Sequence, residues 1–172
     1  MAKITTFSLS LLFIFVGMLF YKFEYENVKT SQKEMPNLIF ENATMYKINE
    51  KEVASIVKAK KAMNYKSGKV IMHNGTLYSK SKDNKTNSLV RADLIVEEND
   101  IVKFKSNVIY SRDDDLFFTT DELKYDKITK IASNNVKFEA KQKNNIFRGD
   151  TILINQNNNK IKAKNVEFLY AK

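Results

Sequence analysis

Residues able to do chemistry are few in this chain and stand apart from one another. His73 is the only histidine and cysteine is absent, which excludes disulfides, thiolate metal sites and a cysteine nucleophile. A histidine metal site or a histidine-based triad needs partner residues that the sequence does not provide. We therefore interpret His73 as a residue of the surface or of a strand end.

Two short acidic motifs also invite a chemical reading. The run "RDDD", residues 112–115, lacks the ligand spacing and the glycine of a calcium loop and is typical of a solvated hairpin turn. The tripeptide within "FRGD", residues 147–150, falls at a repeated position described below, which indicates a structural role. No pair of carboxylates accompanies a nucleophile. The sequence predicts no enzyme, no catalytic residue, no metal site and no cofactor.

The charge balance allows an anionic partner. The formal net charge is +9, which is typical of proteins that meet nucleic acid, acidic lipid or a phosphorylated glycolipid. The basic residues are nearly all lysine and are scattered along the chain, a pattern that base composition of the genome also produces. We expect no nucleic-acid binding.

The N-terminal residues predict a membrane anchor. Residues 4–23, "ITTFSLSLLFIFVGMLFYKF", carry no charge before Lys22, and twenty helical residues span ~30 Å, one hydrocarbon core. A cleaved signal peptide is the alternative, but no small-residue cleavage pattern follows the apolar run. We expect a single-pass anchor over residues 1–23 with a cytoplasmic N-terminus, a polar tether over 24–35, and a domain outside the cytoplasm over 36–172.

Most of the remaining chain is a repeat of four units. Each unit starts with two apolar residues, has a small residue soon after, and closes on an asparagine 15 or 16 residues later. In three units an acidic residue, Asp93, Asp121 or Asp150, follows the small residue, and Lys60 takes that place in the first. The small residue and the asparagine of the successive units are Ala59 and Asn74, Ala92 and Asn107, Thr120 and Asn135, and Gly149 and Asn165.

Each unit reads as a strand, a tight turn and a second strand. Stretches such as "IVKFKSNVIYS" alternate apolar and polar residues, and turn clusters such as "EENDI" separate them. A change of phase near Lys164 and Asn165 predicts a β-bulge. Because a lone hairpin is marginal in water, the units are expected to stack around a shared apolar interior. The predicted fold is all-β, with an ordinary closed sandwich as the alternative.

An open stack of hairpins leaves a last strand with unpaired backbone groups. The segment "IKAKNVEFLYAK" ends the chain, and strand addition by another protein is expected there. The residues that define this predicted partner edge are Ile161, Ala163, Val166 and Phe168.

This organisation resembles the LptC family. The resemblance rests on the apolar N-terminal run, the tether, the segment "PNLIFENATMYKINE" at 36–50 and the hairpin units from Leu89 onward. It implies an inner-membrane component of the lipopolysaccharide export machinery with a periplasmic, V-shaped, open β-jellyroll of repeated antiparallel hairpins. It also implies association with the transporter proteins LptB, LptF and LptG and addition of the C-terminal edge to LptA.

The resemblance further implies a hydrophobic groove for the acyl chains of lipopolysaccharide, between two sheets. Plain core packing is the alternative for each lining residue, and an anchored scaffold with a closed core is the alternative for the whole protein. The candidate groove residues, chosen by inward alternation, are Phe40, Thr44, Met72, Leu94, Phe104, Val108, Leu123, Tyr125, Val136, Phe138, Ile152, Ile154 and Phe168.

Overall fold

The computed structural model describes residues 34–48, 53–80, 86–158 and 160–170. The chain divides into two units, Met1–Met35 and Pro36–Lys172. The expected anchor, residues 1–23, and the first part of the tether lie outside the described residues. Among the residues that are described, no helix has the length and apolar character needed to cross a membrane.

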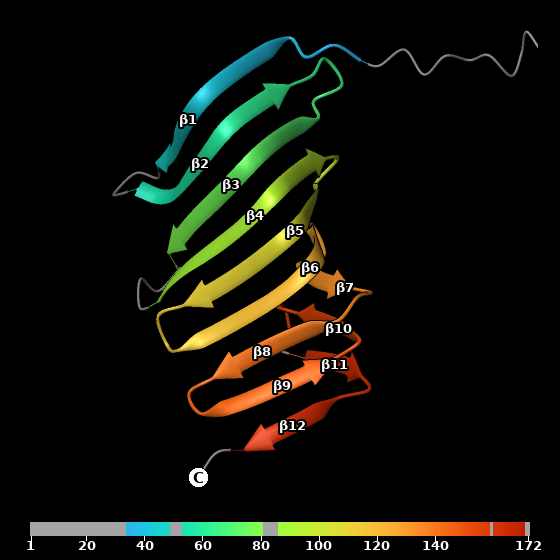
Figure 1. Cartoon of the computed structure of the whole chain (residues 1–172). Coiled ribbons are helices and arrows are strands. Elements are labelled where there is room, and N and C mark those ends of the chain that lie inside the picture. The colour runs from blue at the N-terminus through green and yellow to red at the C-terminus, as the bar shows by residue number, and fades with distance from the viewer. Residues whose placement is uncertain (1–33, 49–52, 81–85, 159, 171–172) are drawn as a thin grey trace, which may run out of the picture. The chain divides into compact units, whose positions relative to one another are not determined.

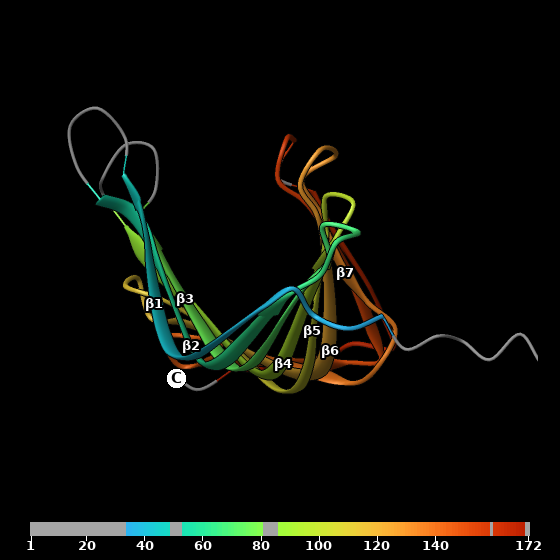
Figure 2. The same cartoon turned by 90° about the horizontal axis from the view of Figure 1, so that it is seen from above.

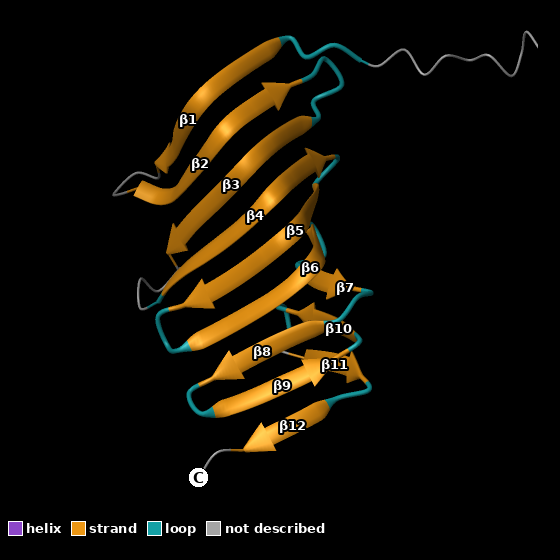
Figure 3. Ribbon diagram, in the orientation of Figure 1, coloured by secondary structure: helices purple, strands orange, loops and turns teal. Residues whose placement is uncertain are grey.

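Twelve antiparallel strands in the described part of residues 36–172 form one sheet (Figures 1 and 3). Six long strands pair in chain order, and six short strands follow them. The strands are β1 (Leu38–Ile48), β2 (Val53–Asn64), β3 (Val70–Lys80), β4 (Asn87–Glu98), β5 (Ile101–Arg112), β6 (Leu116–Asp126), β7 (Ile131–Asn134), β8 (Phe138–Gln142), β9 (Asn145–Gly149), β10 (Thr151–Asn155), β11 (Lys160–Lys164) and β12 (Glu167–Tyr170).

Local sequence explains the strands and the turns that join them. Apolar β-branched and aromatic residues alternate with polar ones, as in "IVKFK" at the start of β5, which suits a sheet with one face covered. The β4–β5 connection is a two-residue turn in which Asn99 and Asp100 both have positive φ, a geometry that Asn and Asp tolerate. The predicted all-β, antiparallel hairpin fold is therefore confirmed for the described residues.

One face of the sheet carries the hydrophobic core. Ile95 and Val108 are fully buried, and burial of such side chains contributes about 1.5–3 kcal/mol each. We call the face that bears Ile95 and Val108 the inner face and its opposite the outer face. The first cluster of buried side chains comprises Ala59, Met72, Ala92, Ile95, Val102, Phe104 and Val108, and the second comprises Phe118, Phe138 and Ile152.

Each long strand breaks its alternation near the middle. Ala92 and Ile95 belong to the same cluster although they lie three residues apart, a spacing that regular pleating would place on opposite faces. Between β4 and β5 the register shifts at this point, and Ser106 and Asn107 in β5 both have positive φ. Such irregularities bend a strand and increase its twist, and Figure 2 shows the bent strands of this unit from above.

The bend divides the sheet into two arms at β6. The first half of β6, through Thr120, pairs with β8, whereas its last residues, from Lys124, pair with β7. The chain then alternates between the arms, because β9 and β12 extend from β8 while β10 and β11 extend from β7. We call these the β8 arm and the β7 arm, each including the adjoining halves of β1–β6.

Three of the four asparagines of the repeat mark this bend. Asn74, Asn107 and Asn165 have φ of 48°, 53° and 51°, in the left-handed region that asparagine tolerates better than most residues. Asn42 in β1, outside the four sequence units, has φ 51° and extends the pattern to the first strand. The change of phase predicted at Lys164 and Asn165 coincides with a break between strands rather than a bulge within one, since β11 ends at Lys164, Asn165 has positive φ, and β12 begins at Glu167.

Candidate functional site

The inner face is the candidate site, because apolar side chains continue across it from the first strand to the last. Cross-strand pairing places inner residues side by side, and we call each row of directly paired residues a level of the sheet. One such level runs from Phe40 through Ala62 and Met72 to Ile95 and Phe104. No reactive residue interrupts it. An apolar surface of this kind binds by excluding water, without making or breaking bonds.

Most of the candidate groove residues share the inner face. Met72, Phe104, Val108, Phe138 and Ile152 are buried within the two clusters, and Leu123, Tyr125 and Ile154 pack against them half-buried. Val136 lies in the bend between β7 and β8 and is half-buried. Phe40 and Phe168 are half-exposed. The buried members pack the core, so only the exposed ones are open to a ligand in this structure.

The prediction that the side chains of Thr44 and Leu94 face the groove is wrong. Thr44 pairs with Lys58 and follows inward-facing Ala43, and Leu94 pairs with Lys105 beside inward-facing Ile95. Both therefore lie on the outer face. The error comes from carrying strict alternation across the bend, which shifts the phase of β1 at Asn42 and of β4 at Asp93.

Sequence reasoning left out several inner residues of the bend. Ala59, Ala92, Ile95, Val102 and Phe118 are all buried. The sequence repeat marks Ala59 and Ala92 as small residues but does not identify them as core positions. The sequence signal for these core positions is the three-residue spacing from Ala59 to Ala62 and from Ala92 to Ile95.

The apolar inner face stays uncovered at both ends of the sheet. Leu38, Phe40 and Met45 on β1 are more than half exposed, and so are Ile161 on β11 and Phe168 on β12. In the described structure β1 pairs only with β2, and β11 and β12 each pair on one side only. Each of these strands therefore offers both an unpaired backbone edge and apolar side chains to a further strand.

The predicted C-terminal edge strand is divided between the arms. Ile161 and Ala163 lie on β11, Phe168 lies on β12, and Val166 lies in the bend that joins them. Phe168 contacts Phe147 of β9, with ring centroids 4.7 Å apart. A strand added here would have to bend in the same way in order to pair with both pieces.

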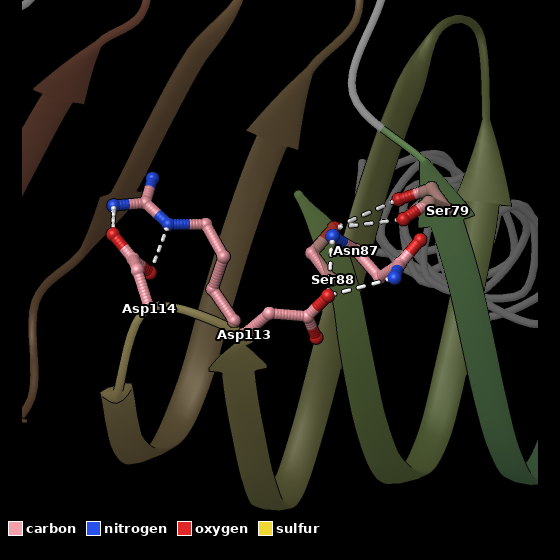
Figure 4. A network of polar contacts seen from close by, with 6 residues as sticks. Ser79, Asn87, Ser88, Asp113 and Asp114 are labelled. Atoms are coloured by element: carbon pink, nitrogen blue, oxygen red, sulfur yellow. Dashed lines mark hydrogen bonds and ion pairs between the residues drawn. The ribbon is translucent and has the colours of Figure 1, made fainter. Parts of the chain in front are cut away.

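The acidic run at residues 112–115 closes the turn between β5 and β6 (Figure 4). The Arg112 guanidinium donates two hydrogen bonds to the Asp114 carboxylate, at 2.6 and 2.7 Å. This contact lowers the pKa of Asp114 below its usual range. Asp113 accepts hydrogen bonds from the backbone and side-chain nitrogens of Asn87 at 3.0 and 2.7 Å, which ties the turn to β4. The run is a turn, as the sequence predicted.

The "RGD" tripeptide is also structural. Arg148 donates to Glu139 at 2.7 Å, Gly149 is buried, and Asp150 accepts from the Asn165 side chain at 2.6 Å. The recurring aspartates thus have a role in the bend, because Asp93 accepts from Asn107 in the same way, at 2.6 Å.

His73 stands apart from the acidic residues in the described structure. His73 is exposed on the outer face, where it pairs with Lys61 and Leu94. Among the residues described, no group of three His, Cys, Asp or Glu could hold a metal ion. A hollow of about 620 Å³ over β5, β6, β8, β9 and β12 is lined by mixed polar and apolar residues, including Asp121 and Arg148. Its charged side chains are engaged in part with one another, as in the Arg148–Glu139 pair.

The chain shows few similarities to known proteins. No protein-family model matches the chain, and no curated protein matches its sequence. One similar solved structure is the crystal structure of LptH, the LptA homologous periplasmic component of the conserved lipopolysaccharide transport device from Pseudomonas aeruginosa. It is 10% identical, with a TM-score of 0.32, over 80% of this chain and 96% of that chain.

Proposed function

We propose that the chain is a lipid-handling component of lipopolysaccharide export, anchored in the inner membrane and exposed to the periplasm. The observation that carries the proposal is the apolar inner face, which runs across the whole sheet and is left exposed on β1, β11 and β12. The resemblance of the sequence to the LptC family supplies the identity of the lipid and the machinery.

In this proposal the inner face receives acyl chains from the membrane transporter, LptB, LptF and LptG, and passes them toward LptA. Passage needs no bond chemistry, so the lack of a reaction centre in the described residues is compatible with it. The unpaired edges of β11 and β12 would accept a strand of LptA, and the apolar residues beside them would continue the path.

The experiment is site-specific photocrosslinking in cells. A benzoylphenylalanine residue replaces Phe40, which is 52% exposed on the inner face, and its neighbour Ile39, which is 53% exposed on the outer face, is the matched control. Phe168 on the inner face and Leu169 on the outer face make a second pair at the other end of the sheet. All four positions are exposed, whereas a bulky probe at a buried position such as Phe104 would disrupt the core.

We expect adducts with lipopolysaccharide at Phe40 and Phe168, dependent on ATP, and none at Ile39 and Leu169. Equal adducts on both faces, or none on the inner face, would contradict the proposal. The alternative of an anchored scaffold without lipid cargo would then be favoured.

A further inference from the structure

A row of mostly apolar side chains crosses the outer face of the β8 arm. Its members occupy one level of six successive strands, and each is paired directly with the next. We call these residues the outer row: Tyr46, Ile56, Tyr78, Leu89, Ser111 and Phe117.

The outer row faces away from the core. Phe118 belongs to the second core cluster, and Val57, Leu77 and Val90 pack against the first. Each of the four is the sequence neighbour of a row member, so alternation turns the row outward. Tyr46, Tyr78 and Phe117 are exposed. At about 4.8 Å between strands, six positions extend over roughly 24 Å. A row of this length with three exposed aromatic side chains is a candidate contact surface.

The residues on one flank of the row are basic or neutral. The adjacent level of the same strands contains Lys58 and Arg91 and no acidic residue from β1 to β6; it consists of Thr44, Lys58, Thr76, Arg91, Ile109 and Thr119. The Lys58 ammonium lies 5.8 Å from the centre of the Tyr78 ring, which places a cation directly over an aromatic member of the row.

Most of the acidic residues nearest the row are engaged in hydrogen bonds or ion pairs. At the β5–β6 turn Asp113 accepts hydrogen bonds from Asn87 and Asp114 pairs with Arg112, which leaves Asp115 as the remaining carboxylate of the turn (Figure 4). Farther along the level that contains Lys58, Glu139 and Glu167 both lie within ion-pair distance of Arg148. Positive charge therefore lies along the flank of the outer row that contains Lys58 and Arg91, whereas the turn that contains Asp113 and Asp115 lies at its β5–β6 end.

The outer face of the β7 arm is arranged differently. It has an apolar level on β1–β4 without an aromatic residue, and that level continues into Lys103 and Lys124. The adjacent level carries Lys61 and Lys105 together with Glu41 and Glu122, and Glu122 pairs with Lys105. The two arms thus differ in the surface they present.

We propose that the outer row docks the β8 arm onto an anionic lipid surface. Tyrosine and phenylalanine side chains suit the boundary between headgroups and acyl chains, and Lys58 and Arg91 lie where they would meet lipid phosphates. Contact with a second copy of the chain is the alternative that the experiment below separates from lipid docking. This docking is independent of the lipid cargo proposed for the inner face.

The test uses the full chain with a single cysteine, since the native sequence has none. Ser111→Cys lies within the outer row, and Ser133→Cys is its matched control, a half-buried serine on the outer face of the β7 arm. Each variant carries an environment-sensitive fluorophore. It is reconstituted into vesicles of phosphatidylcholine alone, or with phosphatidylglycerol, that contain a lipid-borne quencher.

We expect the label at position 111 to shift to the blue and to be quenched in the anionic vesicles only, while the label at 133 stays in water. Lys58→Gln or Arg91→Gln should each lower the ratio of docked to undocked arm about fivefold. Equal behaviour of the two labels, or equal quenching of label 111 in neutral vesicles, would overturn the proposal. So would protection at 111 that needs no lipid and rises with protein concentration, which would indicate self-association. Photocrosslinking at Phe40 tests separately whether the inner face carries a lipid.

Discussion

The Asn107 side-chain amide donates a hydrogen bond of 2.6 Å to the carboxylate of Asp93 across the bend of β4 and β5. The same contact joins Asn165 to Asp150 at the other end of the sheet. In both cases an asparagine with positive φ is held by the aspartate that follows a small buried residue. The repeat is therefore a device for bending the sheet at one level in successive strands.

The asparagine of the bend is expected to act through both its backbone and its side chain. Asn107→Ala should lower the free energy of unfolding by about 2–3 kcal/mol, because alanine disfavours positive φ and the bond to Asp93 is lost. Asn107→Gly should cost about 1 kcal/mol, since only the bond is lost. Urea denaturation of the detergent-solubilised full chain measures both. Asn74→Gly is the control, because Lys60 replaces the aspartate in that unit and little change is expected. Equal losses for Ala and Gly at position 107 would argue against a backbone role.

The glycines of the bend are expected to differ in tolerance. A Cβ at Gly149 would lie 2.7 Å from the Phe138 ring and 3.0 Å from the backbone oxygen of Lys164. A Cβ at Gly75 would meet the terminal carbon of Ile95, which can shift. Gly149→Ala should therefore destabilise more than Gly75→Ala, by about 1–3 kcal/mol. Thermal unfolding compares the two variants. Addition of Phe138→Leu should recover part of the stability lost in Gly149→Ala but none of that lost in Gly75→Ala. A larger loss in Gly75→Ala than in Gly149→Ala would show that the contact with the Phe138 ring is not the limiting one.

The junction of β6, β7 and β10 is expected to depend on one buried amide. Asn134 donates to the Thr120 hydroxyl at 2.9 Å and accepts from the backbone N–H of Ile152 at 2.8 Å. Asn134→Leu leaves that buried N–H without its acceptor and should cost about 1–3 kcal/mol. Hydrogen exchange should accelerate at the Ile152 amide more than at the Phe104 amide, which lies within the long strands. An unchanged exchange rate at the Ile152 amide would show that another group accepts its hydrogen bond.

Stability is expected to fall in acid. The backbone N–H groups of Thr129 and Ile128 donate to the Asp126 carboxylate, each at 2.9 Å, and they lower the pKa of Asp126. A carboxyl whose folded pKa lies below its unfolded value stabilises the fold fully above the unfolded value. That stabilisation is lost as the pH falls through the folded value, so the decline should begin below about pH 4. Urea midpoints measured from neutral to acid pH test this. Asp126→Asn keeps the acceptor oxygen and should show a shallower decline; an identical decline would assign the effect to other carboxyls.

The sequence by itself determined the strands, the turns and the periodic markers of the bend. These are local properties: alternation of Phe104 with Lys103 and Lys105, turn residues such as Asn99 and Asp100, and the recurring Asn107 and Asn165 can all be read within a few residues. The expectation that the hairpins share one apolar face followed from the same alternation.

Only the tertiary structure decided which face each residue joins and how the sheet divides. Strict alternation misplaced Thr44 and Leu94, because a bend of one residue reverses every later side chain in its strand. The split of β6 between β7 and β8, and of the last strand into β11 and β12, depends on pairing between segments far apart in the chain. Such pairing is set by the register of the whole sheet, and no short stretch of sequence encodes it. For the same reason the exposed outer row, whose six members come from six different strands, becomes visible only when the strands lie side by side.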